Sequence, residues 1–454
     1  MGEQTAGRGR SPAPQKTAKK GPELRWAGKR AYRPARYLPA RLAEQYGDEK
    51  DGWRNRIYQG DNRCVMGHLL REWSGKISLI YIDPPFDSSA DYSKKIKLGG
   101  RGDAAVTPVF EKKQYTDIWA GDDYLQFMYE RLCAMRGLLS EDGSIYVQID
   151  EKRAPYLRLI MDEVFGAGCF QREIVWRIGW LSGYKTAAKN WIRNHDLILF
   201  YTKGPRFKFN KQYIPYAADY LRRDGSKPHG RGYPLEDTWN CSEVDRLDSI
   251  QIMSFNTEKT GYPTQKNENL LARIIEASSD PGDIVFDCFM GSGTAQTAAM
   301  KLGRRFIGAD INPAAIQTAI QRLAGTAAAL RVQPDKYTGF DVYRLGPDDP
   351  APRLGQDCAA SARRDGRLLV VEAFYPPELL GRLGLRREQI GDWRELTECI
   401  AIDWRYDGAV LRPAVIDLPH KGAPVAGAYD IPADAGRIRV KLTDLMSESL
   451  ELEV

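Results

Sequence analysis

The chain has 454 residues, of which 43% are hydrophobic and 28% charged, values ordinary for a globular protein with room for two or three domains. No apolar run approaches the roughly 18 residues of a membrane span, and no apolar stretch follows the basic N-terminus, so we expect a cytoplasmic protein without a signal peptide. Seven scattered cysteines without a CxxC pair indicate neither a disulfide framework nor a zinc site, and we expect no metal.

The positive charge is concentrated in an N-terminal tail. Residues 1–36 carry ten Lys and Arg against two Glu, whereas the rest of the chain has a small acidic excess. The tail has no hydrophobic period, so we expect a disordered basic arm. Such an arm can bind nucleic-acid phosphates without reading sequence, and a solvated tail is the alternative. Trp26, Tyr32 and Tyr37 are interleaved with the charges and offer rings that can stack or dock.

The first ordered unit ends in an unusual turn. A strand at 56–59 leads through Gly60 and Asp61 to a helix, and a buried strand at 77–82 runs into Asp83-Pro84-Pro85-Phe86. Proline cannot continue a central strand, so Asp83 stands at a carboxyl end, where open α/β sheets bind ligands. A carboxylate, a rigid carbonyl and an aromatic ring suit a planar heterocycle with an exocyclic amine. A plain proline turn is the alternative, as helix capping is for Asp61.

Strands and helices then alternate, which predicts a parallel sheet covered by helices. We expect helices near 122–139 and 155–165, and strands at 144–149, 173–177 and 195–202. Residues 87–120 read as a long loop that closes over the pocket or touches DNA. Residues 204–257 are basic and aromatic without alternation, and we expect either DNA recognition or a surface excursion.

A glycine loop opens the second half of this pattern. A strand at 283–287 is followed by a loop with Gly291 and Gly293, then by a helix, a strand and Asp310. This order is typical of nucleoside binding, with the acid on the ribose. The dinucleotide pattern fails because Gln296 stands where it requires glycine, and no Gly-Lys-Ser/Thr phosphate loop is present. The pattern therefore favours S-adenosylmethionine. Asp287 is expected near its amino-acid end, and Phe289, Met290 and Thr294 are expected to line the pocket.

The last hundred residues differ in composition. Strands near 368–374 and 437–442, with a hairpin around Asp407-Gly408, predict a small α+β domain over 345–454. Tyr375-Pro376-Pro377 imitates the earlier turn but lacks its acid. We expect this domain to serve recognition or the docking of a partner subunit, with dimerisation or stabilisation as the alternative.

Taken together, Asp83–Phe86 and the segment from Asp287 to Thr294 resemble the DNA amino-methyltransferases that modify adenine N6 or cytosine N4. The motif order is that of the permuted β class. The segments 60–62, 143–150 and 260–266 are also similar to that family, although Asn267 replaces its usual proline. Residues 119–149 resemble the Mod subunits of type III restriction-modification systems. The resemblance covers roughly residues 54–325.

The resemblance implies a fold, a reaction and a set of site residues. The fold is α/β, a Rossmann-like S-adenosylmethionine-dependent methyltransferase sheet with permuted motifs, an inserted recognition segment and the small C-terminal α+β domain. Its parts are the arm 1–36, a catalytic half 37–203, the recognition segment 204–257, a cofactor half 258–335 and the domain 345–454. The catalytic residues expected are Asp83, Pro84, Pro85 and Phe86. The cofactor-binding residues expected are Asp61, Thr264, Gln265, Lys266, Asp287, Phe289, Met290, Gly291, Ser292, Gly293, Thr294, Asp310 and Asn312.

The substrate expected is double-stranded DNA, with methyl transfer to N6 of a flipped-out adenine, because an aspartate opens the Asp-Pro-Pro-Phe motif where a serine goes with cytosine. Cytosine N4 and a non-catalytic DNA-binding subunit are the alternatives. The resemblance also leaves room for a homodimer and for a restriction or other defence-system partner.

Overall fold

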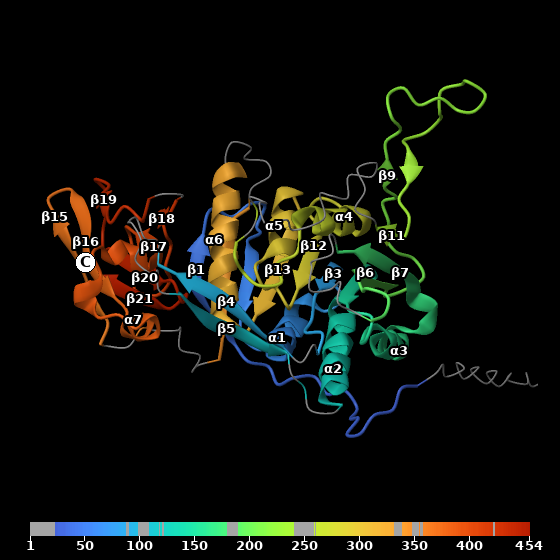
Figure 1. Ribbon diagram of the computed structural model, residues 1–454, viewed down its shortest axis with the longest axis horizontal. Coiled ribbons are helices and arrows are strands. Elements are labelled where there is room, and N and C mark those ends of the chain that lie inside the picture. The colour runs from blue at the N-terminus through green and yellow to red at the C-terminus, as the bar shows by residue number, and fades with distance from the viewer. Residues whose placement is uncertain are drawn as a thin grey trace, which may run out of the picture.

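A computed structural model of the chain describes residues 23–87, 90–98, 109–117, 119, 122–178, 189–239, 258, 260–330, 338–346, 354, 357–420 and 423–454 (Figure 1). No helix in these ranges is long and apolar enough to cross a membrane. Nothing in the same ranges groups His, Cys, Asp or Glu as metal ligands.

The centre of the molecule is a ten-stranded sheet with the order β1-β14-β2-β13-β12-β3-β6-β8-β7-β11. Its strands are β1 (Ala40–Tyr46), β2 (Asn55–Gln59), β3 (Ile77–Ile82), β6 (Leu139–Ile149), β7 (Phe170–Arg177), β8 (His195–Thr202), β11 (Thr238–Trp239), β12 (Ile284–Asp287), β13 (Arg305–Asp310) and β14 (Phe340–Leu345). The six strands from β14 to β6 are mutually parallel. Their carboxyl ends therefore meet at one edge, called here the carboxyl edge.

The predicted parallel sheet is mixed in the structure, because it departs from parallel pairing at two places. β8 runs antiparallel to both β6 and β7, and β1 runs antiparallel to β14. Parallel neighbours need a crossover of a dozen or more residues, usually a helix, and no helix was predicted between the strands at 173–177 and 195–202. β7 and β8 consequently pair antiparallel with each other.

Helices cover both faces of the sheet and make a three-layer sandwich. One face packs α1 (Asn62–Trp73), α2 (Asp123–Leu138) and α3 (Ala154–Phe165), and the other packs α4 (Glu268–Ser278), α5 (Thr294–Lys301) and α6 (Pro313–Leu330). A short 3-10 turn (Ala167–Cys169) follows α3. Strand β3 contributes side chains to the apolar cores on both faces of the sheet. Ile80 and Ile82 pack on one face, and Leu79 and Tyr81 pack on the other. A strand buried on both faces holds its last residue in a fixed position.

The described part of the basic arm, residues 23–36, is docked rather than disordered. Trp26 is 9% exposed and meets Tyr129 of α2 edge-on. The backbone N–H groups of Ala27 and Arg30 donate to Asp122 and to Gln126 of α2, each at 3.0 Å. Burial of the Trp26 ring stabilises the docked segment despite its polar composition, because Trp removes a large apolar area from water.

Residues 87–120 were expected to be a loop, and their described part is a β-hairpin. β4 (Ala90–Lys97) pairs antiparallel with β5 (Val109–Asp117), apart from the central sheet. Figure 1 shows the hairpin running from the carboxyl edge towards the C-terminal domain. Strands were not predicted here because the stretch is rich in Lys and other polar residues, and apolar and polar residues do not alternate along β5.

Residues 204–239 leave the sheet at the edge opposite the carboxyl edge. Thr202 ends β8 beside Ser144, near the start of β6, and Lys208 pairs with Asp283, just before β12. From there β9 (Tyr213–Ile214) and β10 (Tyr233–Pro234) form a protruding finger (Figure 1). A role of this finger in DNA recognition stays a prediction. DNA bound at the carboxyl edge would have to extend to the opposite edge of the sheet to contact the finger.

The C-terminal domain is α+β, as predicted from its composition. Its strands are β15 (Ala359–Asp365), β16 (Leu368–Tyr375), β17 (Thr397–Asp403), β18 (Val415–Asp417), β19 (Ala428–Asp430), β20 (Arg439–Asp444) and β21 (Ser449–Glu453), with α7 (Pro377–Leu383) and 3-10 turns at Arg387–Gln389 and Trp393–Leu396. It docks on β1, where Leu411 exchanges backbone hydrogen bonds with Ala43 and Gln45. The buried Glu44 of β1 pairs there with Lys441 at 2.8 Å and with Arg344 at 3.2 Å.

Candidate active site

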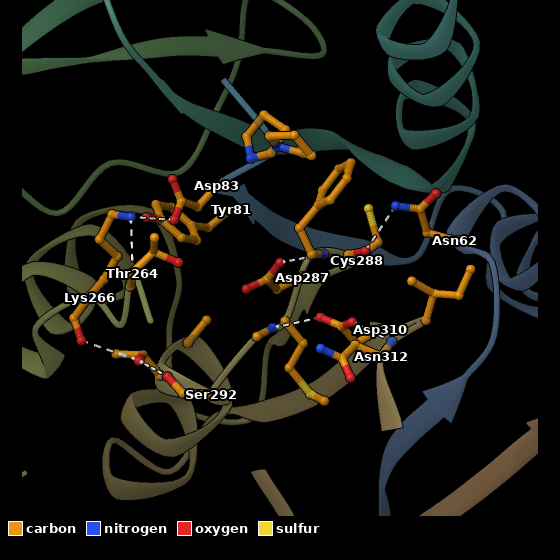
Figure 2. Close-up of a pocket in the computed structure, with 18 of the residues that line it drawn as sticks. Asn62, Tyr81, Asp83, Thr264, Lys266, Asp287, Cys288, Ser292, Asp310 and Asn312 are labelled. Carbon is orange, nitrogen blue, oxygen red and sulfur yellow. Dashed lines mark hydrogen bonds and ion pairs between the residues drawn. The ribbon is translucent and has the colours of Figure 1, made fainter. Parts of the chain in front are cut away.

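A cavity of about 320 Å³ opens at the carboxyl ends of β2, β3, β12 and β13 (Figure 2). Sixteen of the seventeen predicted site residues line it, and Gly293 is the exception. They are Asp61, Asp83, Pro84, Pro85, Phe86, Thr264, Gln265, Lys266, Asp287, Phe289, Met290, Gly291, Ser292, Thr294, Asp310 and Asn312. Residues more than 200 positions apart thus share one cavity, because the strands that carry them are neighbours in the sheet.

The turn after β3 places a carboxylate on the cavity wall. Oδ2 of Asp83 pairs with the Lys266 ammonium, whereas Oδ1 is buried and has no hydrogen-bond partner within the described structure. Burial raises the pKa of Asp83, although the Lys266 charge opposes the shift. A buried acceptor without a donor is costly unless a ligand supplies one. Asp83 is therefore built to receive an N–H or O–H group in this cavity.

The glycine loop turns tightly around Asp310. Gly291, at φ 51°, donates its N–H to Asp310 Oδ2 at 2.8 Å, and Asn312 donates its N–H to Oδ1 at 2.8 Å. Gly293 starts α5 at φ 74°, and a Cβ there would stand 2.9 Å from the Cβ of Ala319, so both conformation and space require glycine. Burial raises the pKa of Asp310 to about 6 despite these N–H groups.

The segment before α4 closes the cofactor half of the cavity. Thr264 adopts φ 62°, and Thr294 donates its hydroxyl to the Lys266 carbonyl at 3.2 Å. The Gln265 side chain bonds Thr260 and the Glu258 carbonyl, at 2.8 Å and 2.7 Å. The Gln265 amide therefore shapes its own segment, and cofactor binding by that side chain remains a prediction.

A buried network that the prediction omitted supports the wall next to β2. Asn62 donates to the Cys288 carbonyl at 3.0 Å and accepts from Arg131 Nε at 2.6 Å. Arg131 also bonds Asp61 at 3.2 Å and lies over the Phe127 ring at 3.4 Å. The sequence feature that could have identified this network is a charged residue on the apolar face of α2. Arg131 lies on that face because it follows Met128 by three positions and precedes Met135 by four. The other lining residues missed are Tyr81, Asp117, Trp119, Tyr262, Leu271, Ala295 and Ile311.

Acidic side chains outnumber basic ones in the cavity. Five aspartates line it, against the cations of Lys266 and Arg131. The pKa of Asp287 is raised well above its usual value, first by burial and then by the neighbouring Asp83 and Asp310 carboxylates. Such a wall repels phosphates and favours a cationic ligand. The sulfonium and ammonium charges of S-adenosylmethionine fit this set of carboxylates, whereas the pyrophosphate of a dinucleotide does not.

Residues 77–321 match the family model of the DNA methylases, N6_N4_Mtase, and the chain belongs to this family. It is therefore a DNA amino-methyltransferase of the N6/N4 type, and this membership supports S-adenosylmethionine as its cofactor. The predicted family and its cofactor are confirmed.

Among curated relatives, the type II methyltransferase M.HpaI of Haemophilus parainfluenzae is 33% identical over 62% of this chain and 77% of its own length. The DNA adenine methyltransferase YhdJ of Escherichia coli is 28% identical over 59% of this chain and 82% of its own. The EcoP15I Mod subunit of a type III restriction-modification enzyme of E. coli is 28% identical over 40% of this chain and 30% of its own. A solved complex of M1.HpyAVI with SAM covers 59% of this chain and 98% of its own, at 21% identity and a TM-score of 0.38.

Proposed function

We propose that this protein transfers a methyl group from S-adenosylmethionine to N6 of an adenine flipped out of double-stranded DNA. The observation that carries the proposal is the unpartnered Oδ1 of Asp83, held in the same cavity as the glycine loop and Asp310. The cavity thus offers an amine acceptor beside a nucleoside-binding half. The name of the YhdJ relative, an adenine methyltransferase, agrees with the choice of base.

In this proposal, the glycine loop and Asp310 hold the adenosine part of the cofactor. Asp310 stands at the end of β13, where a carboxylate can accept ribose hydroxyls. Phe289 and the exposed Ile311 line the same end of the cavity and offer apolar contact to the adenine. Asp287 is then left near the ammonium, whose charge would oppose the rise in pKa that burial and the neighbouring carboxylates cause. The bound group supplies an electrophilic methyl carbon on a sulfonium.

The target base would occupy the space between Asp83 and Phe86. A stacked base cannot enter the cavity, so it must leave the duplex at a cost of a few kcal/mol. Phe86 would stack on the extruded ring, an interaction worth roughly 1–3 kcal/mol. Oδ1 of Asp83 and the Pro84 carbonyl would accept the two amine hydrogens. The nitrogen lone pair then points into the cofactor half.

Catalysis in this arrangement is positioning and electrostatics. As the methyl carbon passed from the sulfonium sulfur to the amine nitrogen, the S–C bond would break with its electron pair left on sulfur, and the Asp83 carboxylate would stabilise the positive charge gained by the nitrogen. The surplus proton must then leave the nitrogen. Burial raises the pKa of Asp83, which makes its carboxylate a better acceptor for that proton. Lys266 keeps the other oxygen occupied, so the carboxylate presents one face to the base.

DNA would approach along the carboxyl edge, where exposed basic and aromatic residues gather. Residues 23–36 lie at the start of α2 with Arg30 and Arg36 exposed. Trp191 precedes β8 at the same edge and is 98% exposed. Arg193, two residues later, anchors this stretch by pairing with Glu151 and Asp196. A fully exposed indole at this edge of the sheet suits stacking on DNA bases.

Cytosine N4 is the second candidate, because it presents the same exocyclic amine to the same acceptors. The test is nucleoside mass spectrometry of DNA incubated with the purified protein and labelled S-adenosylmethionine. We expect the label in N6-methyladenine. Label in N4-methylcytosine would overturn the base assignment and keep the site, whereas no label in either base would count against the proposal. A homodimer and a defence-system partner stay predictions, which mass photometry and co-purification would test.

A further inference from the structure

The β4–β5 hairpin joins the catalytic turn to the C-terminal domain. β4 begins four residues after Phe86, and its eight residues span about 26 Å at roughly 3.3 Å each. Leu98, just beyond β4, is 8% exposed and packs in one apolar cluster with Leu379, Leu380 and Leu383 of α7. Figure 1 shows the hairpin crossing the front of the molecule to α7. One end of the hairpin is therefore fixed to the C-terminal domain.

The other end of the hairpin holds the catalytic turn through Asp117. This residue ends β5 opposite Ala90 and is 1% exposed. Its Oδ2 accepts the N–H of Phe86 at 3.1 Å, and its Oδ1 accepts the N–H of Asp87 at 2.7 Å. The indole of Trp119 donates to the same Oδ1 at 3.3 Å. One buried carboxylate thus binds two consecutive peptide groups of the turn.

The turn depends on this support because its backbone is not relaxed. Asp87 adopts φ 55°, a left-handed conformation that a residue other than glycine keeps only when its surroundings hold it. Its side chain pairs with Arg153, the residue just before α3, and this ion pair is a second contact that holds the turn. Asp117 fixes the N–H of Phe86. Because the Pro84-Pro85 pair is rigid, fixing Phe86 also fixes the position of the Pro84 carbonyl.

We propose that Asp117 is the positioning residue of the catalytic turn, and that the hairpin makes the geometry of this turn depend on the docking of α7. The inference rests on the proposed function, because it assigns the support of the same turn. A misplacement of about 1 Å in a reacting pair can cost on the order of 100-fold in rate. A partner that displaced α7 would therefore change the rate of transfer and leave cofactor affinity alone.

The C-terminal domain also docks on β1. The effect of the hairpin contact on the catalytic turn can therefore be measured separately from the stability of the domain interface. Glu44, Lys441 and the backbone bonds of Leu411 hold the domain to the central sheet without the hairpin. Removing the Leu98 contact should release the hairpin while the domain stays attached. The hairpin contact and the main interface can thus be perturbed one at a time.

The experiment compares Leu98→Ser with Leu98→Met, and uses Leu368→Ser as the matched control because Leu368 is a 41% exposed leucine of the C-terminal domain. Each variant is assayed for kcat, for KM of DNA, for the Kd of S-adenosylmethionine, and for amide hydrogen exchange at Phe86 and Asp87. We expect Leu98→Ser to lower kcat at least about 5-fold and to speed exchange at both amides about 10-fold. The Kd should change less than 2-fold, and Leu98→Met should restore both readouts.

A second variant, Asp117→Asn, tests the positioning residue itself. The asparagine keeps the size of the side chain but offers an amide N–H to one of the two peptide donors. We expect kcat to fall about 10- to 100-fold, with faster exchange at Phe86 and Asp87 and an unchanged Kd for the cofactor.

Wild-type kcat and exchange in Leu98→Ser would overturn the coupling, and in Asp117→Asn they would overturn the positioning role. The exchange readout does not need turnover. If the wild-type protein methylated neither base, exchange at these amides would still decide the coupling while the proposed function alone failed.

Discussion

Replacing Asp83 with asparagine tests the proposed catalytic acceptor. In the native site one oxygen pairs with Lys266, and the other has no hydrogen-bond partner among the described residues. An asparagine would have to turn its carbonyl towards the Lys266 ammonium, because two donors cannot face each other. Its NH₂ group would then occupy the place of Oδ1 and meet the hydrogens of the target amine. The substitution therefore removes an acceptor and also introduces a donor.

The expected loss follows from these two effects. Removing one preorganised polar group from a transition state costs about 2.7–4 kcal/mol, which corresponds to about 100- to 1,000-fold in rate. The misplaced donor adds to this, so we expect a fall of at least about 1,000-fold. The Kd of the cofactor should change only a few-fold, because the glycine loop and Asp310 are untouched.

The assay is single-turnover transfer of labelled methyl groups at saturating DNA, with calorimetry for the cofactor. Asp365→Asn is the control, because its side chain is 60% exposed in the C-terminal domain. A rate within about 10-fold of wild type in Asp83→Asn would refute the acceptor role. A parallel loss of cofactor binding would move Asp83 to the cofactor site instead.

Four further outcomes are expected from other parts of the molecule. Phe86→Ala should lower kcat/KM about 5- to 150-fold, the equivalent of roughly 1–3 kcal/mol of stacking, while Phe86→Trp should stay within a few-fold of the wild-type kcat/KM. Equal rates in the Ala and Trp variants would exclude stacking. Burial raises the pKa of Asp310 to about 6, so this carboxyl is protonated below that pH. Cofactor affinity measured by calorimetry should therefore rise from pH 5 to 7. Asp310→Asn should remove most of this pH dependence. Trp191→Ala should raise KM for DNA several-fold in steady-state assays and leave the Kd of the cofactor unchanged; an unaltered KM would place the indole outside the DNA surface. Glu44→Gln should destabilise the chain by about 3–5 kcal/mol, because Lys441 loses its buried partner, and an unchanged melting temperature would contradict this.

The sequence predicted those parts of the site that lie at strand ends. Asp83 and Asp310 were found because each follows a buried apolar strand, and parallel strands bring their carboxyl ends to one edge. The glycine loop was found because its positive φ angles demand glycine. These features are local, and the chemistry of a few neighbouring residues determines them.

The parts that were missed depend on distant contacts. Arg131 belongs to the site only because α2 packs beside α1 and meets Asn62. The hairpin is rich in charged and polar residues, and Leu98, which anchors it, packs on α7 almost 300 residues later in the chain. Trp26 reverses the expectation of disorder by packing on Tyr129. A single sequence read along its length does not reveal such pairings.

The strand order of the central sheet also constrains how the protein is made. β2 and β3 are synthesised early, yet β12 and β13 lie between them, and β14 flanks β2 on its other side. β3 can pair with β6 soon after it is made, but the ribosome must add more than 200 residues after Ile82 before β3 meets β12 and before β2 meets either of its neighbours, β13 and β14. Until then their backbone N–H and C=O groups are open to wrong partners, and pairings this distant in sequence fold slowly. Nascent chains that stop before Leu345 should thus be captured by chaperones or lost, so that no methyl transfer can begin on the ribosome before the sheet is closed.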